Sequence, residues 1–280
     1  MSSSSNRFAE YLRARRAQLK PEDAGFPADP GRRVSGLKRE EVAELAGISL
    51  EYYTRLEQGQ HYQLSEPVLE GLTRGLQLDA DAAAYFYRLA LPEVPRSSTG
   101  ETPVLDERLL HVIEGWAHAP VFITDRNLDI LIANDLSLGI FPWLVPGTNV
   151  VLAVFSVPAE VRNLEGWPTL ARASVAGLRF HGDPSDPRLQ EVVGELSVRE
   201  TLFRELWAGY DARPLVSGSI GVFISDFGLV DLEWQVLGAP GGLSMTVWVP
   251  KPASPAAEAI NYVRARLDSG AERLDEAHAS

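Results

Sequence analysis

Residues 37–59, LKREEVAELAGISLEYYTRLEQG, decide the fold of the N-terminal part of the chain. Apolar residues from Val42 onward follow helical spacing, and Gly47 ends that helix because glycine tolerates the left-handed cap conformation. Ser49 is placed to cap a second helix, which Gly59 closes. Two short helices joined by a glycine-containing turn form a helix-turn-helix, whose second helix fits the major groove of DNA.

The second helix of this motif has an apolar side and an outer side. Tyr53 and Leu56 lie on the apolar side, so we expect them in the core. Because a major groove admits one helix, side chains on the outer side can reach base edges. The candidate DNA-binding residues of the motif and the preceding loop are Arg32, Arg33, Lys38, Arg39, Ser49, Leu50, Glu51, Tyr52, Arg55 and Gln58. The alternative is a small helical bundle with a chance helix-turn-helix.

The loop before the motif, PEDAGFPADPGRRVSG at 21–36, is long for a connection between helices. Its adjacent arginines, 32 and 33, can bind phosphate or enter a narrow minor groove; a solvated loop that confers only solubility is the alternative. The chain carries a net charge of −12, yet residues 7–39 hold 9 Lys and Arg against 4 Asp and Glu. Since salt screens distant charge, this local basic surface can still attract phosphate.

The stretch 37–59 resembles the XRE family of helix-turn-helix regulators, most specifically in Arg-Leu-Glu-Gln-Gly at 55–59. The resemblance implies a phosphate contact from Arg39 and a contact of Gln58 with the DNA backbone. The residues implied to face bases are Leu50, Glu51 and Arg55.

The same resemblance implies a structural pair between Glu57 and Arg16. Leu50 departs from the family pattern, which often has Gln or Ser at that position. Glu51 can accept a hydrogen bond only from cytosine N4, so the pattern does not specify the bases that are read.

The chain divides at the proline-rich stretch LPEVPRSSTGETP, residues 91–103. Proline cannot continue a helix, and Ser, Thr and Gly gain little from burial, which predicts a linker over 92–105. Residues 1–91 are expected to form a five-helix DNA-binding domain. Residues 106–270 are expected to form a ligand-binding and dimerisation domain, followed by a flexible tail at 271–280.

The second half combines strand-like and helical patterns. Strands are predicted at 120–124 and 129–133, joined by the turn Asp125-Arg-Asn127, and the pattern is helical between 158 and 203. The remaining predicted elements are strands at 219–225, 229–237 and 243–249 and a helix at 256–267. This order predicts an α+β domain, whose opening resembles a PAS-type sensor.

Nearly the whole chain, residues 7–268, is similar to the MmyB-like group of XRE regulators, in which a PAS-like domain follows the helix-turn-helix. The matching stretches are 36–43, 52–59, 183–189, 195–197 and 203–208. The resemblance implies a transcription regulator whose sensor half can hold an apolar, fatty-acid-like molecule.

Two departures bear on that ligand. Leu152 stands where the family commonly has Arg, and Gly218-Ser219 stands where a His-Pro pair is common. If either position helps to hold a polar head group, a neutral or wholly apolar effector is favoured over a carboxylate. The candidate lining residues are Trp116, Phe122, Leu152, Phe155, Phe203, Trp207, Phe223 and Trp234, with ordinary core packing as the alternative for each aromatic residue.

Several classes of function find no support in the sequence. Cys is absent, which excludes disulfides, cysteine-bound metals and cysteine nucleophiles. No two of the five His are spaced as a helical metal pair, so we expect no metal, no cofactor and no enzyme activity. Since neither a secretory signal nor a membrane-length apolar run is present, we expect a cytoplasmic protein without a membrane partner.

The expected partners are therefore double-stranded operator DNA, an apolar small-molecule effector and a second copy of the chain. Regulators of this kind usually bind paired half-sites as dimers. Dimerisation is assigned mainly to the second half, because the helix-turn-helix half shows no separate dimerisation helix. Two rival interpretations stay open: a DNA-binding protein without effector, whose second half serves only dimerisation, and a small-molecule carrier.

Overall fold

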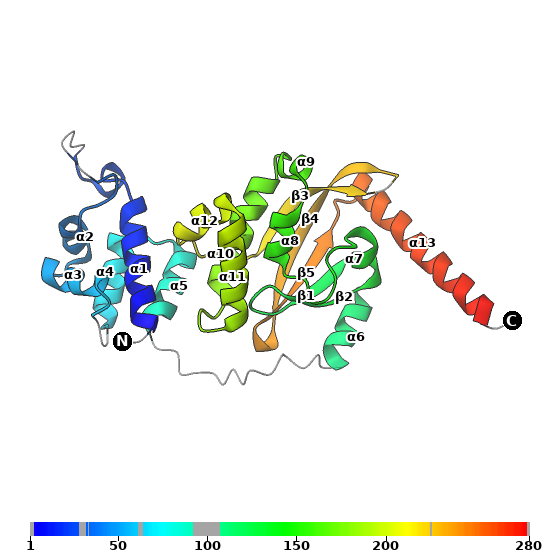
Figure 1. Cartoon of the computed structure of the whole chain (residues 1–280), viewed down its shortest axis with the longest axis horizontal. Coiled ribbons are helices and arrows are strands. Elements are labelled where there is room, and N and C mark those ends of the chain that lie inside the picture. Colours follow the sequence, from blue (N-terminus) through cyan, green and yellow to red (C-terminus); the bar gives the residue numbers. More distant parts are fainter. Residues whose placement is uncertain are drawn as a thin grey trace. The chain divides into compact units, whose positions relative to one another are not determined.

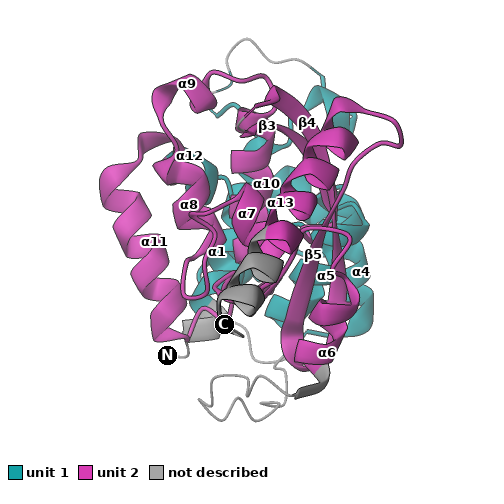
Figure 2. Ribbon diagram, turned by 90° about the vertical axis from the view of Figure 1, so that its right-hand side faces the viewer, with its two compact units in different colours: residues 1–99, 205–213 teal, residues 100–204, 214–280 magenta. Residues whose placement is uncertain are grey.

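The chain forms two compact units in a computed structural model that describes residues 3–27, 32, 34–60, 64–91, 107–224 and 226–278. Unit 1 comprises residues 1–99 with 205–213, and unit 2 comprises residues 100–204 with 214–280 (Figure 2). The linker predicted at 92–105 lies outside the described residues.

Unit 1 contains the five predicted helices (Figure 1). They are α1 (Ser3–Gln18), α2 (Arg39–Ala46), α3 (Leu50–Glu57), α4 (Glu66–Gly75) and α5 (Ala80–Ala90), with a 3-10 turn at Glu22–Ala24. Phe8 of α1 stacks on Phe86 of α5 with ring centroids 5.3 Å apart, and both side chains are fully buried. The first and last helices of the bundle are thereby held together through its core.

The turn between α2 and α3 has the cap residues that the sequence predicts. Gly47 adopts a φ of 69°, the left-handed region that favours glycine. Ser49 caps α3, since its Oγ accepts a hydrogen bond from the backbone N–H of Tyr52 at 3.1 Å. Ser65 precedes α4 as expected, but its side chain accepts no cap hydrogen bond from a described residue.

Unit 2 combines helices with a five-stranded antiparallel sheet, which confirms the α+β prediction. The strands are β1 (Val121–Thr124), β2 (Ile130–Ala133), β3 (Ser217–Ile224), β4 (Gly228–Ala239) and β5 (Leu243–Val249), in the spatial order β2-β1-β5-β4-β3 (Figure 1). The helices are α6 (Glu107–Gly115), α7 (Asp135–Ile140), α8 (Val150–Ser156), α9 (Ala159–Arg162), α10 (Trp167–His181), α11 (Pro187–Arg199), α12 (Thr201–Ala208) and α13 (Pro255–His278), with a short 3-10 turn at Pro240–Gly242.

Alternation of side chains along the strands gives the sheet two different faces. One face carries Phe122, Trp234 and Trp248, and residues of α7 and α13 pack into the same cluster. The opposite face carries Val121 and Val247, which pack with α6. The first face contributes most of the sheet residues that line the cavity described below, among them Phe122, Trp234 and Trp248.

Two helices differ from the sequence prediction. Helix α8 was not foreseen; Asn149 caps it, with Oδ1 accepting from the backbone N–H of Val151 at 3.0 Å and of Leu152 at 3.3 Å. Helix α13 runs to His278 instead of ending at 267, so it includes residues 271–278, where a tail was expected.

Helix α12 contributes residues to both units. Its residues up to 204 belong to unit 2, whereas residues 205–213 belong to unit 1. Within unit 1, the Tyr210 hydroxyl donates a hydrogen bond to Glu10 at 2.5 Å, and Arg213 forms an ion pair with Asp79 at 2.7 Å. A continuous stretch of chain after α11 thus leaves the sheet domain and joins the helical bundle.

Candidate functional site

Helix α3 presents a mixed polar and apolar outer face. Leu50 is 47% exposed, and Glu51 and Arg55 form an exposed ion pair one helical turn apart, with N and O 2.7 Å apart. Tyr53 and Leu56 are fully buried, which confirms their predicted place in the core. Tyr52 is half-buried and Gln58 is exposed at the end of the helix. The side chains predicted to contact bases therefore share the solvent side of α3.

A buried carboxylate ties α3 to two other elements. Glu57 is 1% exposed; its Oε1 lies 2.5 Å from Nε of Arg16, and its Oε2 lies 2.6 Å from Nε of Arg39. Burial acts to raise the pKa of Glu57, but hydrogen bonds from Arg16 and Arg39 outweigh it and hold the pKa below its usual value.

The Arg16–Glu57 pair implied by the family resemblance is thus present. Arg39, for which phosphate contact was predicted, is half-exposed and anchored by the same carboxylate. Lys38 precedes α2 with an exposed amino group 3.9 Å from Glu40. Both side chains remain accessible on the surface of the motif.

Arg32 occupies a different position from the one expected of a loop arginine. Its side chain is 10% exposed, its Nη1 lies 2.7 Å from Oε1 of Glu41, and it donates to the carbonyl of Gly36 at 2.7 Å. Glu41 in turn accepts from the backbone N–H of Lys38 at 2.6 Å. The guanidinium therefore connects Gly36 to Glu41 of α2, and the phosphate contact of Arg32 stays a prediction. Arg33 lies outside the described residues.

Unit 2 contains a cavity of about 1120 Å³ between the sheet and helices α8, α9 and α10. Its aromatic lining residues are Phe122, Phe141, Trp143, Trp167, Phe223, Trp234 and Trp248. Within the described part of the chain, its ionisable lining residues are Glu160 and His181, and no lysine or arginine lines it. Apolar, aromatic walls with few polar groups are typical of small-molecule sites.

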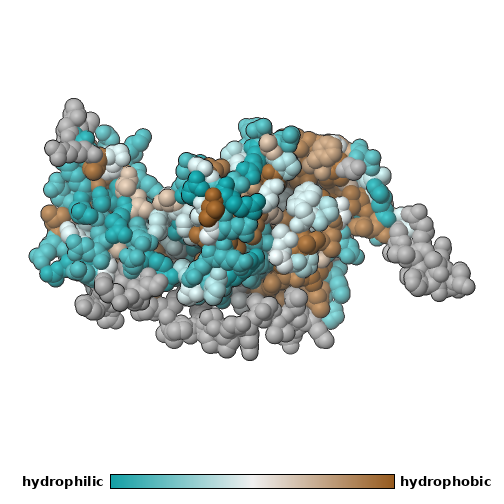
Figure 3. Space-filling view, in the orientation of Figure 1, coloured by the Kyte–Doolittle hydropathy of each residue, from teal (hydrophilic) through white to brown (hydrophobic). Residues whose placement is uncertain are grey.

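Four of the eight predicted lining residues border this cavity: Phe122, Leu152, Phe223 and Trp234. Phe223 is 71% exposed and pairs across the strands with Leu229, which is 55% exposed. Both of these residues line the cavity, so they mark its open side. Figure 3 shows brown, apolar surface over unit 2, whereas the visible face of unit 1 is mostly hydrophilic.

The other four predicted residues do not line this cavity. Trp116 packs with the cluster on the opposite face of the sheet. Phe155 and Phe203 are buried against each other, with ring centroids 5.7 Å apart, so they belong to the core beside the cavity and not to its lining. Trp207 belongs to the part of α12 that joins unit 1. Spacing alone could not separate these positions, because the same spacing also fits residues that pack elsewhere in the fold.

Sequence reasoning missed three of the tryptophans that line the cavity: Trp143, Trp167 and Trp248. Trp248 could have been found from β5, because the two-residue period of a strand places it on the same face as Ser244 and Thr246. The other two stand outside strands, at positions set by the packing of helices.

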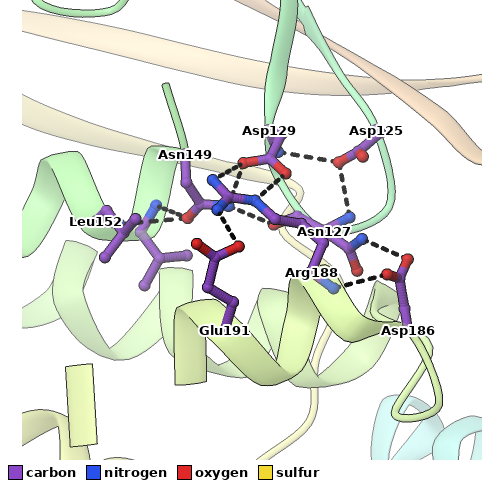
Figure 4. A network of polar contacts seen from close by, with 9 residues as sticks. Asp125, Asn127, Asp129, Asn149, Leu152, Asp186, Arg188 and Glu191 are labelled. Carbon is purple, nitrogen blue, oxygen red and sulfur yellow. Dashed lines mark hydrogen bonds and ion pairs between the residues drawn. The ribbon is translucent and has the colours of Figure 1, made fainter. Parts of the chain in front are cut away.

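A polar network links the loop between β1 and β2 to the start of α8, which carries Leu152 (Figure 4). Arg188 of α11 donates to both carboxylate oxygens of Asp129, at 2.8 and 2.9 Å, and to Glu191 at 2.8 Å. Asn149 donates to Asp129 at 3.0 Å and to the carbonyl of Asn127 at 2.7 Å. These bonds fix the loop between β1 and β2 against the starts of α8 and α11.

The hydrogen bonds of this network already satisfy the guanidinium of Arg188. Hydrogen bonds to Asp129 and Glu191 raise the pKa of Arg188 above its usual value. At the C-terminal end of α8, Arg162 pairs with Glu200 at 3.0 Å, and this hydrogen bond raises the pKa of Arg162. Both arginines therefore stabilise the protein frame, and neither lines the cavity.

A helix-turn-helix bundle followed by an α+β domain with an apolar cavity is the architecture expected of a DNA-binding transcription regulator with a ligand-binding domain. The family model of the MmyB-like transcription regulator ligand binding domain matches residues 105–261, and that of a helix-turn-helix domain matches residues 7–86. The comparison with curated proteins finds no match. Because the first match spans more than half of the chain, the protein belongs to the MmyB-like family of transcription regulators. Within the described ranges, no helix is long and apolar enough to cross a membrane.

Proposed function

We propose that the chain is an effector-responsive regulator whose cavity binds an apolar small molecule and whose α3 reads operator DNA. The observation that carries the proposal is the cavity of about 1120 Å³, whose aromatic walls include only two ionisable side chains among the described lining residues. Burial of apolar surface supplies the driving force for such a ligand. Because the lining is mainly apolar and aromatic, we assign the cavity to binding.

On the DNA side, the proposal gives different roles to different arginines. Arg55, exposed on the outer face of α3, reads a base, whereas Arg39 binds phosphate at the start of α2. Dimerisation through unit 2 would place two α3 helices in successive major grooves, about one helical turn apart.

The effect of the ligand on DNA binding is proposed to pass through α12. Phe203 packs on Phe155, and α8, which carries Phe155, also carries cavity-lining residues such as Leu152. A few residues later the chain belongs to unit 1, where Tyr210 binds Glu10. A ligand can shift DNA affinity only by its differential affinity for two arrangements of the protein.

The deciding experiment has two arms. An operator is first selected from random duplex DNA with the full-length protein, and its affinity is then measured before and after organic extraction of the protein's apolar ligands. We expect extraction to change the operator affinity at least fivefold and re-addition of the extract to restore it. Size-exclusion chromatography with light scattering measures the oligomeric state in both forms.

Three results would overturn the proposal. Absence of operator selection would favour a small-molecule carrier. An operator affinity that is indifferent to extraction and to every apolar compound added would favour a DNA-binding dimer without effector. Turnover of the extracted compound would assign the cavity to catalysis.

A further inference from the structure

Three hydroxyl side chains lie together on the sheet at the wall of the cavity. Thr124 of β1 and Ser244 of β5 are direct cross-strand partners, and Thr246 lies two residues after Ser244 along β5. Directly paired residues of antiparallel strands have their Cβ atoms about 5 Å apart, and residues two apart in a strand share a face. Thr124, Ser244 and Thr246 therefore form one group, which we call the hydroxyl patch.

The alternation of side chains turns the hydroxyl patch toward the cavity. The neighbouring residues Ile123, Leu243 and Met245 pack into the cluster on the opposite face of the sheet. All three members of the hydroxyl patch line the cavity, and so does Phe122, the direct partner of Thr246. The patch is therefore part of the cavity wall, at the end of β1 and the start of β5.

The hydroxyl patch is buried and has no partner in the described part of the protein. Thr124, Ser244 and Thr246 are 2%, 9% and 6% exposed. Within the described residues, none of their hydroxyls forms a hydrogen bond with another protein group, and none of their oxygens is among the buried, unpaired atoms that solvent cannot reach. These oxygens therefore keep accessible surface on the cavity side. Since buried polar groups nearly always have a partner, the contents of the cavity have to supply it.

Two other hydroxyls of the lining are already paired within the protein. Ser174 Oγ donates to the carbonyl of Ala171 at 3.0 Å, and Thr148 Oγ1 donates to the carbonyl of Trp143 at 3.4 Å. The hydroxyl patch differs from them, because its hydrogen-bonding groups are not used by any described residue. A ligand that displaces water from the patch has to replace the hydrogen bonds of that water or lose affinity.

The chemistry of the patch distinguishes between classes of ligand. A hydrocarbon offers it neither donor nor acceptor, which is costly in a buried site. A carboxylate would leave water without meeting a lysine or arginine, because none lines the cavity in the described ranges. An alcohol is uncharged, and its hydroxyl both donates and accepts, as each hydroxyl of the patch does.

We propose that the hydroxyl patch binds the alcohol group of an otherwise apolar ligand. The ligand hydroxyl exchanges hydrogen bonds with Thr124, Ser244 and Thr246, and the hydrocarbon part occupies the space between the sheet and helices α8, α9 and α10. This proposal rests on the proposed function, because it requires that the cavity bind an apolar effector.

The experiment uses the full-length protein after organic extraction and three probes of matched length: 1-dodecanol, tridecane and dodecanoic acid. Affinities of different probes also reflect how readily each one leaves water. The informative quantity is therefore the change that one substitution causes with one probe, measured by competition against a fluorescent apolar dye at pH 7.

Ser244→Ala, Thr246→Val and Thr124→Val each remove a hydroxyl while nearly keeping the shape of the side chain. Each substitution should weaken 1-dodecanol about three- to tenfold, the equivalent of one net hydrogen bond. The same substitutions should leave the affinity for tridecane unchanged or raise it, because this probe uses no hydrogen bond.

Ser174→Ala and Thr148→Val are the matched controls, since their hydroxyls also belong to lining residues but are bonded to backbone carbonyls. Each control should change the affinity for 1-dodecanol less than about twofold. Urea denaturation of the extracted protein tests the fold of every variant. The patch variants should keep the wild-type midpoint, because they lose no hydrogen bond within the protein. A lower midpoint would show that these hydroxyls are bonded inside the protein, which contradicts the proposal.

The binding outcomes separate this proposal from the proposed function. If none of the probes binds, nor any compound from the extract, the apolar effector itself is refuted. If the patch variants bind 1-dodecanol as the wild type does, or weaken 1-dodecanol and tridecane equally, the hydroxyl patch does not bind an alcohol, while the cavity still binds apolar molecules. If dodecanoic acid binds the wild type more tightly than 1-dodecanol, the neutral class is wrong.

Discussion

Gly218 lies beneath the indole ring of Trp234, its cross-strand partner, so closely that a Cβ at position 218 would be 2.5 Å from Cζ2 of that ring. A larger side chain at 218 and the present position of Trp234 therefore exclude each other. The MmyB-like resemblance places a common His at this position. In this chain, Gly218 leaves free the space that the indole of Trp234 occupies in the cavity wall.

Gly218→Ala should destabilise the protein because the added methyl forces Trp234 out of its place. Overpacking of a core typically costs about 1–3 kcal/mol of the free energy of unfolding, which urea denaturation followed by far-UV circular dichroism can measure. Gly238→Ala is the matched control, since it lies in the same sheet and its Cβ would meet no described atom within 4 Å. Equal losses in the two variants would contradict the close contact.

Glu57→Gln should lower the stability of unit 1 at pH 7 by about 3 kcal/mol, because it leaves two arginines beside an uncharged buried side chain. The wild-type pKa of Glu57 is depressed from its usual 4.5. Its contribution is therefore fully present above about pH 4.5 and is lost as the pH falls through the lower, folded-state value. Denaturation measured between pH 7 and pH 3 should show a steeper loss in the wild type than in the variant.

Glu51→Gln supplies the control for that experiment. Glu51 lies on the same helix and pairs with Arg55, but its side chain is 77% exposed, so its removal should change stability by less than about 0.5 kcal/mol. Parallel pH profiles for the wild type and Glu57→Gln would show that the buried carboxylate does not govern acid sensitivity.

Arg55→Ala should weaken binding to a selected operator by about 1–3 kcal/mol and relax its sequence preference, because the guanidinium lies on the exposed face of α3. Arg39→Ala should weaken selected and random DNA alike. Fluorescence anisotropy with both duplexes separates the two effects, and Arg74→Ala, an exposed arginine of α4, is the control. Equal losses of affinity for Arg55→Ala on both duplexes would show that Arg55 does not read a base.

Arg32→Ala should act on stability and not on the salt dependence of DNA binding. The guanidinium is buried against Glu41, so we expect a loss of about 1–3 kcal/mol in the free energy of unfolding. The slope of log affinity against log salt concentration should stay unchanged, because no phosphate contact is lost. A slope reduced by about one would show that Arg32 contacts a phosphate of the DNA.

The sequence predicted best those features that depend on local chemistry. The cap at Ser49, the glycine turn at Gly47 and the buried position of Tyr53 follow from residue type and helical period. The ion pair of Arg32 with Glu41 was not predicted, because no local pattern records a contact between these two residues.

The cavity wall was predicted only in part, for a similar reason. Which aromatic residues face the cavity depends on the register between strands and on which face of the sheet each helix covers. Trp234 and Trp248 become neighbours through the pairing of β4 with β5, and Trp116 is on the other face although it precedes β1 closely in the sequence. These relationships arise from tertiary packing, which the spacing of single residues does not encode.

Leu152→Arg should make the cavity prefer an acidic ligand over its neutral analogue. Residue 152 lines the cavity from α8, and the nearby carboxylates of Asp129 and Glu191 are already bound by Arg188, so a new guanidinium would be available to a ligand. Charge-assisted hydrogen bonds to a carboxylate are worth roughly twice neutral ones, so the variant should prefer dodecanoic acid over dodecanol by about tenfold or more. Thermal shift and competition binding at pH 7 measure this ratio, with Leu152→Gln as a polar, uncharged control. An unchanged preference, or a preference for the alcohol, would mean that position 152 does not meet the polar end of the ligand.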